Sequence, residues 1–253
     1  QALINFVTTA GISKRENVID VSLLEYCVRE ELNKTSTRVM AVVNPVKLII
    51  TNYPEGQTEE LTAINNPEDE SQGSRILPFA KELYIEREDF KEEANRKFFR
   101  LTLGKEVRLK NAYIIKGESV IKDSEGNITE IHSTYDPDSK SGSGSEASMR
   151  KVKGTIHWVS VEHAIDAEVR NYDRLFSDES PDQHKEQSFL DFVNPDSLSI
   201  QNAKVEPSLV TLAIGERVQF QRLGYYTPDF DTTSSNLVFN KIVGLRDTWA
   251  KKQ

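Results

Sequence analysis

The stretch Arg38–Ile50, which reads RVMAVVNPVKLII, carries the pattern that decides the fold. Its apolar residues alternate or cluster and are rich in β-branched side chains, which favours a strand over a helix. Pro45 interrupts the run, as a residue at a sheet edge or in a bulge does. We therefore expect strands to dominate the chain from Arg38 onward.

The residues before this stretch have a helical pattern. Ala2–Thr9 is rich in apolar residues and is followed by Gly11, a frequent helix terminator. Ser22 and Glu25 have the spacing of a capping box, and the apolar residues that follow them mark one face of a second helix. Residues 1–36 are thus expected to form a short α-helical tail.

The residues after this stretch are expected to form short strands, with turn signals such as Ser124–Asn127 between them. This spacing is typical of a barrel or a sandwich and not of alternating βαβ units. The length fits two barrels, so the predicted fold class is mainly β: two β-barrels preceded by a short α-helical tail. Glu88–Arg96 is expected to be one helical insertion. The strand candidates are Leu83–Ile85, Phe98–Leu103, Glu106–Ile115, Val120–Lys122, Ile128–Tyr135, Lys153–Val159, Ala164–Tyr172, Ser197–Ile200, Arg217–Leu223, Tyr225 and Leu237–Val243.

Composition bounds the class of protein. The 253 residues suffice to bury a core without disulfides or metals, and the mean hydropathy is −0.52. No apolar run approaches the roughly 20 residues of a membrane span. A single cysteine, Cys27, excludes an internal disulfide, and no leader-like segment opens the sequence. We therefore expect a cytoplasmic protein that does not bind membranes.

The net charge of −8 argues against a nucleic-acid binder, but the charge is unevenly distributed. Pro54–Glu93 holds 12 acidic and 4 basic residues, and Phe176–Pro195 holds 5 acidic and 1 basic. Ala94–Lys116 instead carries seven basic residues against Glu106 alone, a local charge of +6. Such a run is equally compatible with an RNA contact and with a solvated face.

The sequence shows no catalytic signature. The four histidines share no helical ligand spacing and have no cysteine neighbours, so no metal site is predicted. Neither a dinucleotide-binding glycine pattern nor a phosphate-binding P-loop occurs, and there is no GxSxG elbow. We predict no catalytic residue and no cofactor within these 253 residues.

Seven short motifs in a fixed order carry a family resemblance. They are RVMAVVNPVKL (Arg38–Leu48), Gly73–Arg75 with Pro78-Phe79, FKEEAN (Phe90–Asn95), LGKEVRLKNAY (Leu103–Tyr113), KVKGTIHWV (Lys151–Val159), YDRLF (Tyr172–Phe176) and GLRDTWAK (Gly244–Lys251). Together they resemble the C-terminal half of the glutaminyl-tRNA synthetases, which are class I aminoacyl-tRNA synthetases. The glutamyl-tRNA synthetases of archaeal and eukaryotic type share this architecture and remain an alternative.

The resemblance implies a division into domains. Residues 1–36 would be the end of a helical connecting domain, 37–103 and 224–253 a proximal barrel, and 104–223 a distal barrel, both of the ribosomal-protein-like barrel fold. In the family these barrels bind the anticodon loop of the tRNA. Glutamine tRNA is then the expected partner of a monomeric protein.

The resemblance also implies an activity for the full-length enzyme. It would ligate glutamine to its tRNA with ATP and magnesium. The two ATP-holding signatures of the family, His-Ile-Gly-His-like and Lys-Met-Ser-Lys-Ser-like, do not occur in this sequence. We therefore expect these 253 residues to be inactive on their own.

The family's base-contacting positions fall on named residues here. By resemblance, Lys105 contacts the first anticodon base and Lys110 the third, where the family usually has arginine. Arginine offers a planar fork, whereas lysine offers a point charge. Another departure is Ser119, where some relatives have an arginine. The middle base, a uracil, is matched by Arg38, Pro78, Gln219 and Arg222, and Asn33 and Thr248 approach the loop.

Two further hypotheses come from other classes of protein. One is a β module that binds RNA without base specificity. The other is a protein-interaction barrel that uses the acidic stretch Pro54–Glu93. Discrimination among tRNAs at fixed salt separates the three, because a nonspecific binder responds mainly to salt and a protein-interaction barrel binds no RNA.

Overall fold

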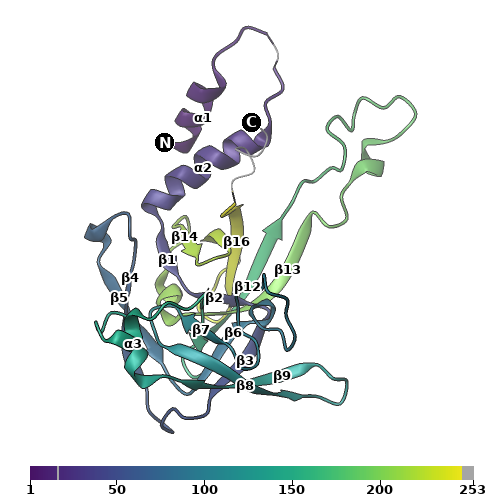
Figure 1. Cartoon of the computed structure of the whole chain (residues 1–253). Coiled ribbons are helices and arrows are strands. Elements are labelled where there is room, and N and C mark those ends of the chain that lie inside the picture. The colour runs from purple at the N-terminus through teal and green to yellow at the C-terminus, as the bar shows by residue number, and fades with distance from the viewer. Residues whose placement is uncertain (16, 247–253) are drawn as a thin grey trace.

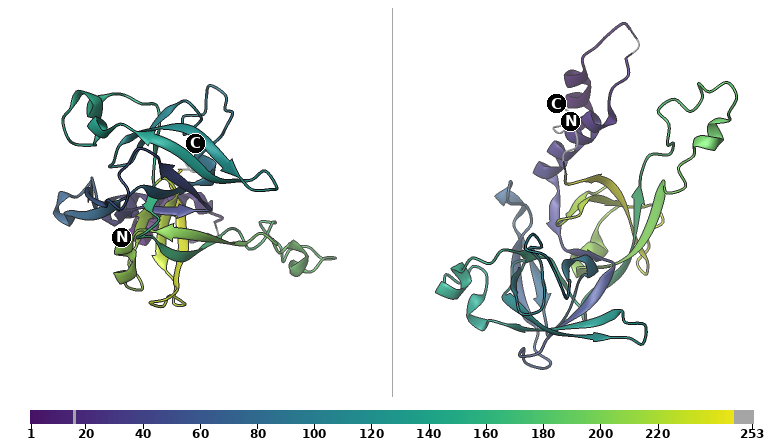
Figure 2. Two further views of the ribbon diagram at one scale, coloured as in Figure 1. Left: turned by 90° about the horizontal axis from the view of Figure 1, so that it is seen from below. Right: turned by 45° about the vertical axis from the view of Figure 1, so that its right-hand side comes forward.

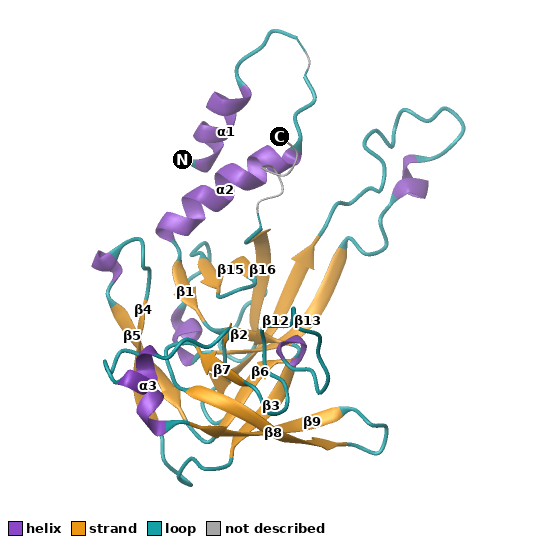
Figure 3. Ribbon diagram, in the orientation of Figure 1, coloured by secondary structure: helices purple, strands orange, loops and turns teal. Residues whose placement is uncertain are grey.

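The computed structural model describes residues 1–15 and 17–246 (Figure 1). Strands dominate and the two longest helices lie at the N-terminal end (Figure 3), which confirms the predicted mainly β class with two barrel-like sheets. The strands are β1 Thr37–Val39, β2 Ala41–Val43, β3 Pro45–Ile50, β4 Glu59–Ile64, β5 Ser74–Phe79, β6 Glu82–Glu86, β7 Glu106–Leu109, β8 Ile114–Lys122, β9 Ile128–Tyr135, β10 Thr155–Ile156, β11 Val159–Ser160, β12 Ile165–Tyr172, β13 Leu198–Val205, β14 Val218–Phe220, β15 Gly224–Pro228 and β16 Leu237–Gly244. The helices are α1 Ala2–Ala10, α2 Val21–Thr35 and α3 Glu146–Met149, with 3-10 turns at Glu70–Gln72, Arg87–Asp89, Pro137–Ser139, Phe189–Phe192 and Pro207–Thr211.

Most of these strands belong to two seven-stranded sheets. Sheet 1 has the order β1-β14-β15-β16-β12-β13-β2, and sheet 2 has the order β10-β7-β8-β9-β3-β6-β11. The edge strands of each sheet are sequence neighbours: Met40 alone separates β1 from β2, and two residues separate β10 from β11. Each sheet must therefore curl until its edges approach, which produces two near-barrels. Strands β4 and β5 form a separate hairpin.

The deciding stretch lies between the two barrels. Val39, Ala41 and Val43 pack into the core of sheet 1, whereas Met40 and Val42 pack into the core of sheet 2. Side chains alternate across a strand, so this run fills two cores at once, which explains why it is continuously apolar.

Pro45 marks the point where the chain passes from one sheet to the other. It is the first residue of β3, a position where a missing N–H is tolerated, and it follows Asn44 at φ 53°. Strand β3 lies inside sheet 2, between β9 and β6, so Pro45 is neither at a sheet edge nor in a bulge.

The residue ranges of the two sheets differ from the expected barrel ranges. Sheet 2 uses strands between residues 45 and 160, and sheet 1 combines 37–43 with strands between 165 and 244. Strands at 106–160 and at 165–220, expected in one distal barrel, therefore belong to different sheets. The two strands β12 and β13 continue outward into the projecting segment 173–197 (Figure 2).

The helical tail packs on sheet 1. Leu32 of α2 lies in a small core with Tyr225 and Val243, and the Arg29 Nε donates to the Gly244 carbonyl at 2.8 Å. The helix begins two residues earlier than a Ser22–Glu25 capping box requires. Asp20 is the N-cap, and its carboxylate accepts from the backbone N–H of Ser22 at 2.9 Å.

The predicted helix at Glu88–Arg96 does not form. Only Arg87–Asp89 turns, as a single 3-10 turn, and Phe90 then bridges Leu101 in parallel. Asp89 is 1% exposed and binds Arg222, which follows β14. A long-range ion pair and backbone pairing thus replace local helix formation.

Candidate nucleic-acid interface

Parallel pairing of two short strands creates the centre of the candidate site. Strand β1 pairs with β14 so that Arg38 lies opposite Gln219, although 181 positions separate them in the sequence. Their side chains line a cleft of about 460 Å³, which we call the Arg38 cleft. It is lined by Arg38, Thr62, Ile64, Pro67, Lys110, Asn111, Ser141, Gly142, Gln219 and Gln221.

A chain of hydrogen bonds connects three of the predicted residues beside this cleft. The Gln219 Nε2 donates to the Tyr225 hydroxyl at 2.8 Å, and that hydroxyl donates to Asn33 Oδ1 at 3.3 Å. The Arg38 Nη2 donates to the same oxygen at 3.0 Å. The network fixes both the amide and the guanidinium, so each is presented in one orientation.

The network leaves hydrogen-bonding capacity unused. The Arg38 Nε is buried without a hydrogen-bond partner among the described residues, and the only carboxylate near this guanidinium there is Glu68, at 4.0 Å. Within the same residues the Gln219 Oε1 accepts no hydrogen bond. The buried Nε is not accessible to a ligand, but the Arg38 Nη1 also forms no hydrogen bond with a described residue and is not buried. Arg38 and Gln219 together can therefore donate to and accept from one polar base edge.

Lys110 forms the facing wall. It follows β7, and its backbone is fixed on both sides: its N–H donates to Ile156 and its carbonyl accepts from Trp158 Nε1, both at 2.9 Å. Its side chain is exposed and forms no ion pair with any described residue. The next residue, Asn111, has a φ of 60°, which turns the chain sharply into β8.

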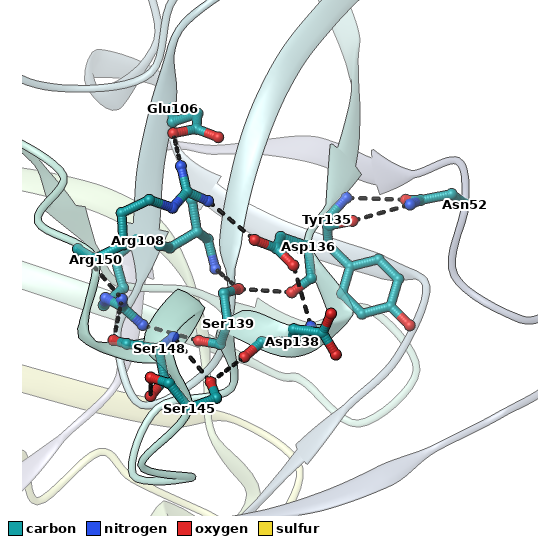
Figure 4. Close-up of polar contacts among 11 residues, drawn as sticks. Asn52, Glu106, Arg108, Tyr135, Asp136, Asp138, Ser139, Ser145, Ser148 and Arg150 are labelled. Atoms are coloured by element: carbon teal, nitrogen blue, oxygen red, sulfur yellow. Dashed lines mark hydrogen bonds and ion pairs between the residues drawn. The ribbon is translucent and has the colours of Figure 1, made fainter.

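The third wall is the segment 137–150, and Arg108 holds it in place (Figure 4). The Arg108 Nη1 donates to the Ser139 carbonyl at 3.0 Å and to Ser141 Oγ at 3.2 Å, and its Nη2 donates to the Ser148 carbonyl at 2.7 Å. Arg150 pairs with Glu106 and Asp136 nearby. Burial and the charge of Arg150 lower the pKa of Arg108, as expected for a guanidinium turned inward. Arg108 therefore orders the segment that places Ser141 and Gly142 at the cleft.

The structure thus brings together Arg38, Lys110 and Gln219, with Asn33 behind them. Pro78 lies elsewhere, beside Trp158 and Glu206. Lys105 is exposed just before β7, at the opposite end of that short strand from Lys110. Thr248 lies outside the described residues.

Arg222 lies at the junction between the two sheets. A strand was expected over Arg217–Leu223, but β14 ends at Phe220 and Arg222 has a φ of 69°, which a regular strand does not allow. Its guanidinium binds both carboxylate oxygens of Asp89, and its Nη1 donates to His157 Nδ1 at 3.2 Å. An arginine held in this way stabilises the junction.

Sequence reasoning missed three contributors to the site. Tyr225 was counted only as a strand residue, yet its hydroxyl links Gln219 to Asn33. Arg108 is one of the seven basic residues of Ala94–Lys116, and the sequence did not single it out as the residue that holds the segment 137–150. Thr62 lines the Arg38 cleft and belongs to the hairpin β4–β5, which the sequence did not predict. The signal that marks Tyr225 is a tyrosine hydroxyl buried inside the protein. This burial can be recognised only once the fold is known.

Comparisons with known proteins identify the family of this chain. Two family models match, at residues 36–136 and 155–229, and both describe the anticodon-binding domain of the class I tRNA synthetases for glutamate and glutamine. The chain belongs to this family.

Within the family, the chain is similar to proteins named glutamine–tRNA ligase. That of Rhodopirellula baltica is 56% identical over 252 residues, which are 99% of this chain and 42% of the relative. That of Proteus mirabilis is 51% identical over 251 residues, 99% of this chain and 44% of the relative. That of Vibrio parahaemolyticus is 50% identical over 247 residues, which are 97% of this chain and 44% of the relative. The chain therefore spans less than half the length of these relatives.

Among the described helices, none has the length and apolar character needed to cross a bilayer.

Proposed function

We propose that this chain binds the anticodon loop of glutamine tRNA and reads its bases. The observation that carries the proposal is the Arg38 cleft, where a guanidinium and an amide are held by one network and still have a free donor and a free acceptor. Membership of the anticodon-binding family and the similarity to glutamine–tRNA ligases support it.

The middle base, a uracil, is assigned to Arg38 and Gln219. A uracil edge offers two carbonyl oxygens and one ring N–H. Arg38 can donate to a carbonyl, and the Gln219 Oε1 can accept from the N–H. A cytosine presents an unprotonated ring nitrogen at the place of that N–H, so the Gln219 acceptor would face another acceptor. Single-stranded bases can be read on these edges, which a paired A-form helix conceals.

Lys110 and Lys105 are assigned to the third and first bases. Lys110 borders the Arg38 cleft directly, so the third base would lie next to the middle one. Lys105 lies at the other end of β7, separated from Lys110 by the four residues of that strand. Asn33 supports Arg38 from α2. Pro78, Arg222 and Thr248 are not among the residues that line the Arg38 cleft. Their contacts with RNA stay predictions.

For the whole protein we propose ATP-dependent ligation of glutamine to its tRNA, in the cytoplasm and as a monomer. The similarity to glutamine–tRNA ligases supports the reaction. Because the two ATP-holding signatures are absent from these 253 residues, we expect the chain alone to give no ATP–pyrophosphate exchange with glutamine. Exchange above background would contradict this assignment.

Filter binding tests the proposed function. The 253-residue chain is titrated, at one salt concentration, against glutamine tRNA and against a copy with cytosine at the middle anticodon position. The proposal predicts tighter binding of the unaltered tRNA. Equal binding of the two would favour a module without base specificity, and no binding of either would favour a protein-interaction barrel.

A further inference from the structure

A second cleft has lining residues that follow, or pair with, the segments that line the Arg38 cleft. It measures about 640 Å³, and we call it the Phe99 cleft. Arg222 at its edge directly follows Gln221 of the Arg38 cleft, and Thr155 pairs with Arg108, two residues before Lys110. The lining residues are Glu88, Lys91, Lys97, Phe98, Phe99, Arg100, Thr155 and Arg222.

The cleft presents an exposed aromatic ring on a rigid backbone. Phe99 is 52% exposed. Its carbonyl lies so close to Gly154 that a Cβ added there would be 2.2 Å from the oxygen, so the two backbones touch and no side chain fits between them. The contact fixes the position of the segment while the ring of Phe99 stays open to solvent.

Three lysines surround the aromatic residues. Lys153 Nζ lies 5.7 Å from the ring centroid of Phe99, and Lys91 Nζ lies 5.3 Å from that of Phe98. These two lysines and Lys97 form no ion pair with any described residue. The two arginines that line the cleft are different, because Arg100 and Arg222 share the buried carboxylate of Asp89. The charges that remain available are therefore three ammonium groups around an exposed ring, against the single exposed carboxylate of Glu88.

We propose that the Phe99 cleft binds one unpaired nucleotide of the RNA adjacent to the anticodon. The base stacks on Phe99, and its neighbouring phosphates lie against Lys97 and Lys153. Aromatic rings beside free cations are the usual means of holding single-stranded nucleic acid without reading its sequence. The inference rests on the proposed function for the identity of the RNA, and it adds a contact that is independent of the bases read in the Arg38 cleft.

Substitution of Phe99 tests the stacking. Filter binding at fixed salt compares the chain with Phe99→Ala, using glutamine tRNA and the copy with cytosine at the middle position. We expect Phe99→Ala to weaken both complexes equally, by about tenfold, and Phe99→Tyr to bind like the unaltered chain. The matched control is Phe230→Ala, since Phe230 is 91% exposed on the loop after β15, and it should change neither affinity.

The lysines are tested through salt. Replacing both Lys97 and Lys153 by alanine should lower the slope of log affinity against log salt by about 1.4, or about 0.7 for each lost contact with a single strand. An unchanged slope overturns the phosphate contacts. Circular dichroism confirms that each variant retains the fold.

The outcomes separate this proposal from the proposed function. If the unaltered chain discriminates between the tRNAs but Phe99→Ala binds both as before, the Phe99 cleft does not contact RNA and the proposal is wrong. That result would favour an acidic protein as the partner of the cleft. If Phe99→Tyr fails as badly as Phe99→Ala, Phe99 has a packing role and the proposal is wrong. If no discrimination exists but Phe99→Ala still weakens binding, the cleft stands and the proposed base reading falls.

Discussion

Arg38 lies on β1, and Arg222 follows the neighbouring strand β14 of sheet 1. The surroundings of the two arginines differ. Arg222 binds a carboxylate that is 1% exposed, and both oxygens of Asp89 are used. Arg38 binds an amide oxygen of Asn33, and its Nε remains without a described partner. A guanidinium neutralised by a buried carboxylate stabilises the fold, whereas one held by a neutral amide keeps its charge and a donor for a ligand. We propose that the kind of partner, and not the arginine itself, separates the structural role of Arg222 from the binding role assigned to Arg38.

The largest effect is expected at another buried ion pair, which joins the end of β13 in sheet 1 to the hairpin β4–β5. Glu206 is 2% exposed and binds the Arg75 guanidinium, with Nη2 at 2.8 Å, and the Met40 N–H at 2.7 Å. Glu206→Ala leaves the Met40 N–H without its acceptor and the Arg75 guanidinium with Asn65 Oδ1 alone, so urea unfolding should show a loss of about 3–5 kcal/mol. As a control, Asp166→Ala removes the exposed pair with Lys204 and should cost less than about 1 kcal/mol. Equal losses would show that the junction pairs are not special.

The two arginines of the comparison should give opposite results. Arg222→Ala deprives buried Asp89 of its bidentate partner, so we expect a loss of about 1–3 kcal/mol of stability, partly offset by Arg100. Arg38→Ala should cost no more than about 1 kcal/mol in urea but should weaken binding of glutamine tRNA more strongly than Arg222→Ala does. The reverse pattern would exchange the roles assigned here.

A smaller effect is expected from Tyr225→Phe, which removes the hydroxyl that joins Gln219 to Asn33. Because one neutral hydrogen-bond link is lost, stability should fall by about 1 kcal/mol. The preference for the unaltered tRNA should also decline, since the Gln219 amide is no longer held in one orientation. A variant that loses stability but keeps the full preference would show that the network does not position Gln219.

The smallest effect is expected at Lys105. Lys105→Ala should lower the salt slope of tRNA binding by about 0.7 if the side chain contacts a phosphate. Lys185→Ala, an exposed lysine on the projecting segment, provides the control and should leave the slope as it was. A slope that Lys105→Ala leaves unchanged would restrict Lys105 to a base edge.

The sequence alone predicts elements whose pattern is local. Strand β9 was expected at Ile128–Tyr135, where it lies, and both helices of the tail were expected. The hairpin β4–β5 was missed because Glu59 and Glu60 read as part of an acidic run, which concealed the burial of Leu61 and Ala63 on one face. A period of two is hard to see in a strand of six residues that opens with two charges and has Ile64 on its exposed face.

Features that depend on distant pairing could not be predicted from local pattern. Glu88–Arg96 read as a helix, but Asp89 pairs with a residue 133 positions away. The expected barrel ranges differ from the sheets because β3 and β6 join the strands between residues 106 and 160, whereas β1 and β2 join those between 165 and 244. The same pairing places Arg38 beside Gln219, and the sequence could suggest this meeting only through a family resemblance.

The most direct test of the account concerns the Gln219 side chain. Filter binding at one salt concentration compares the unaltered chain, Gln219→Ala and the control Gln201→Ala, each with glutamine tRNA and with the copy that has cytosine at the middle position. Gln201 lies on β13 and bonds Asn171, away from the cleft. The account predicts that Gln219→Ala removes about 1–3 kcal/mol of preference, chiefly by weakening the complex with the unaltered tRNA, while Gln201→Ala keeps it. Equal weakening of both complexes by Gln219→Ala would contradict the assignment of the uracil to the Arg38 cleft.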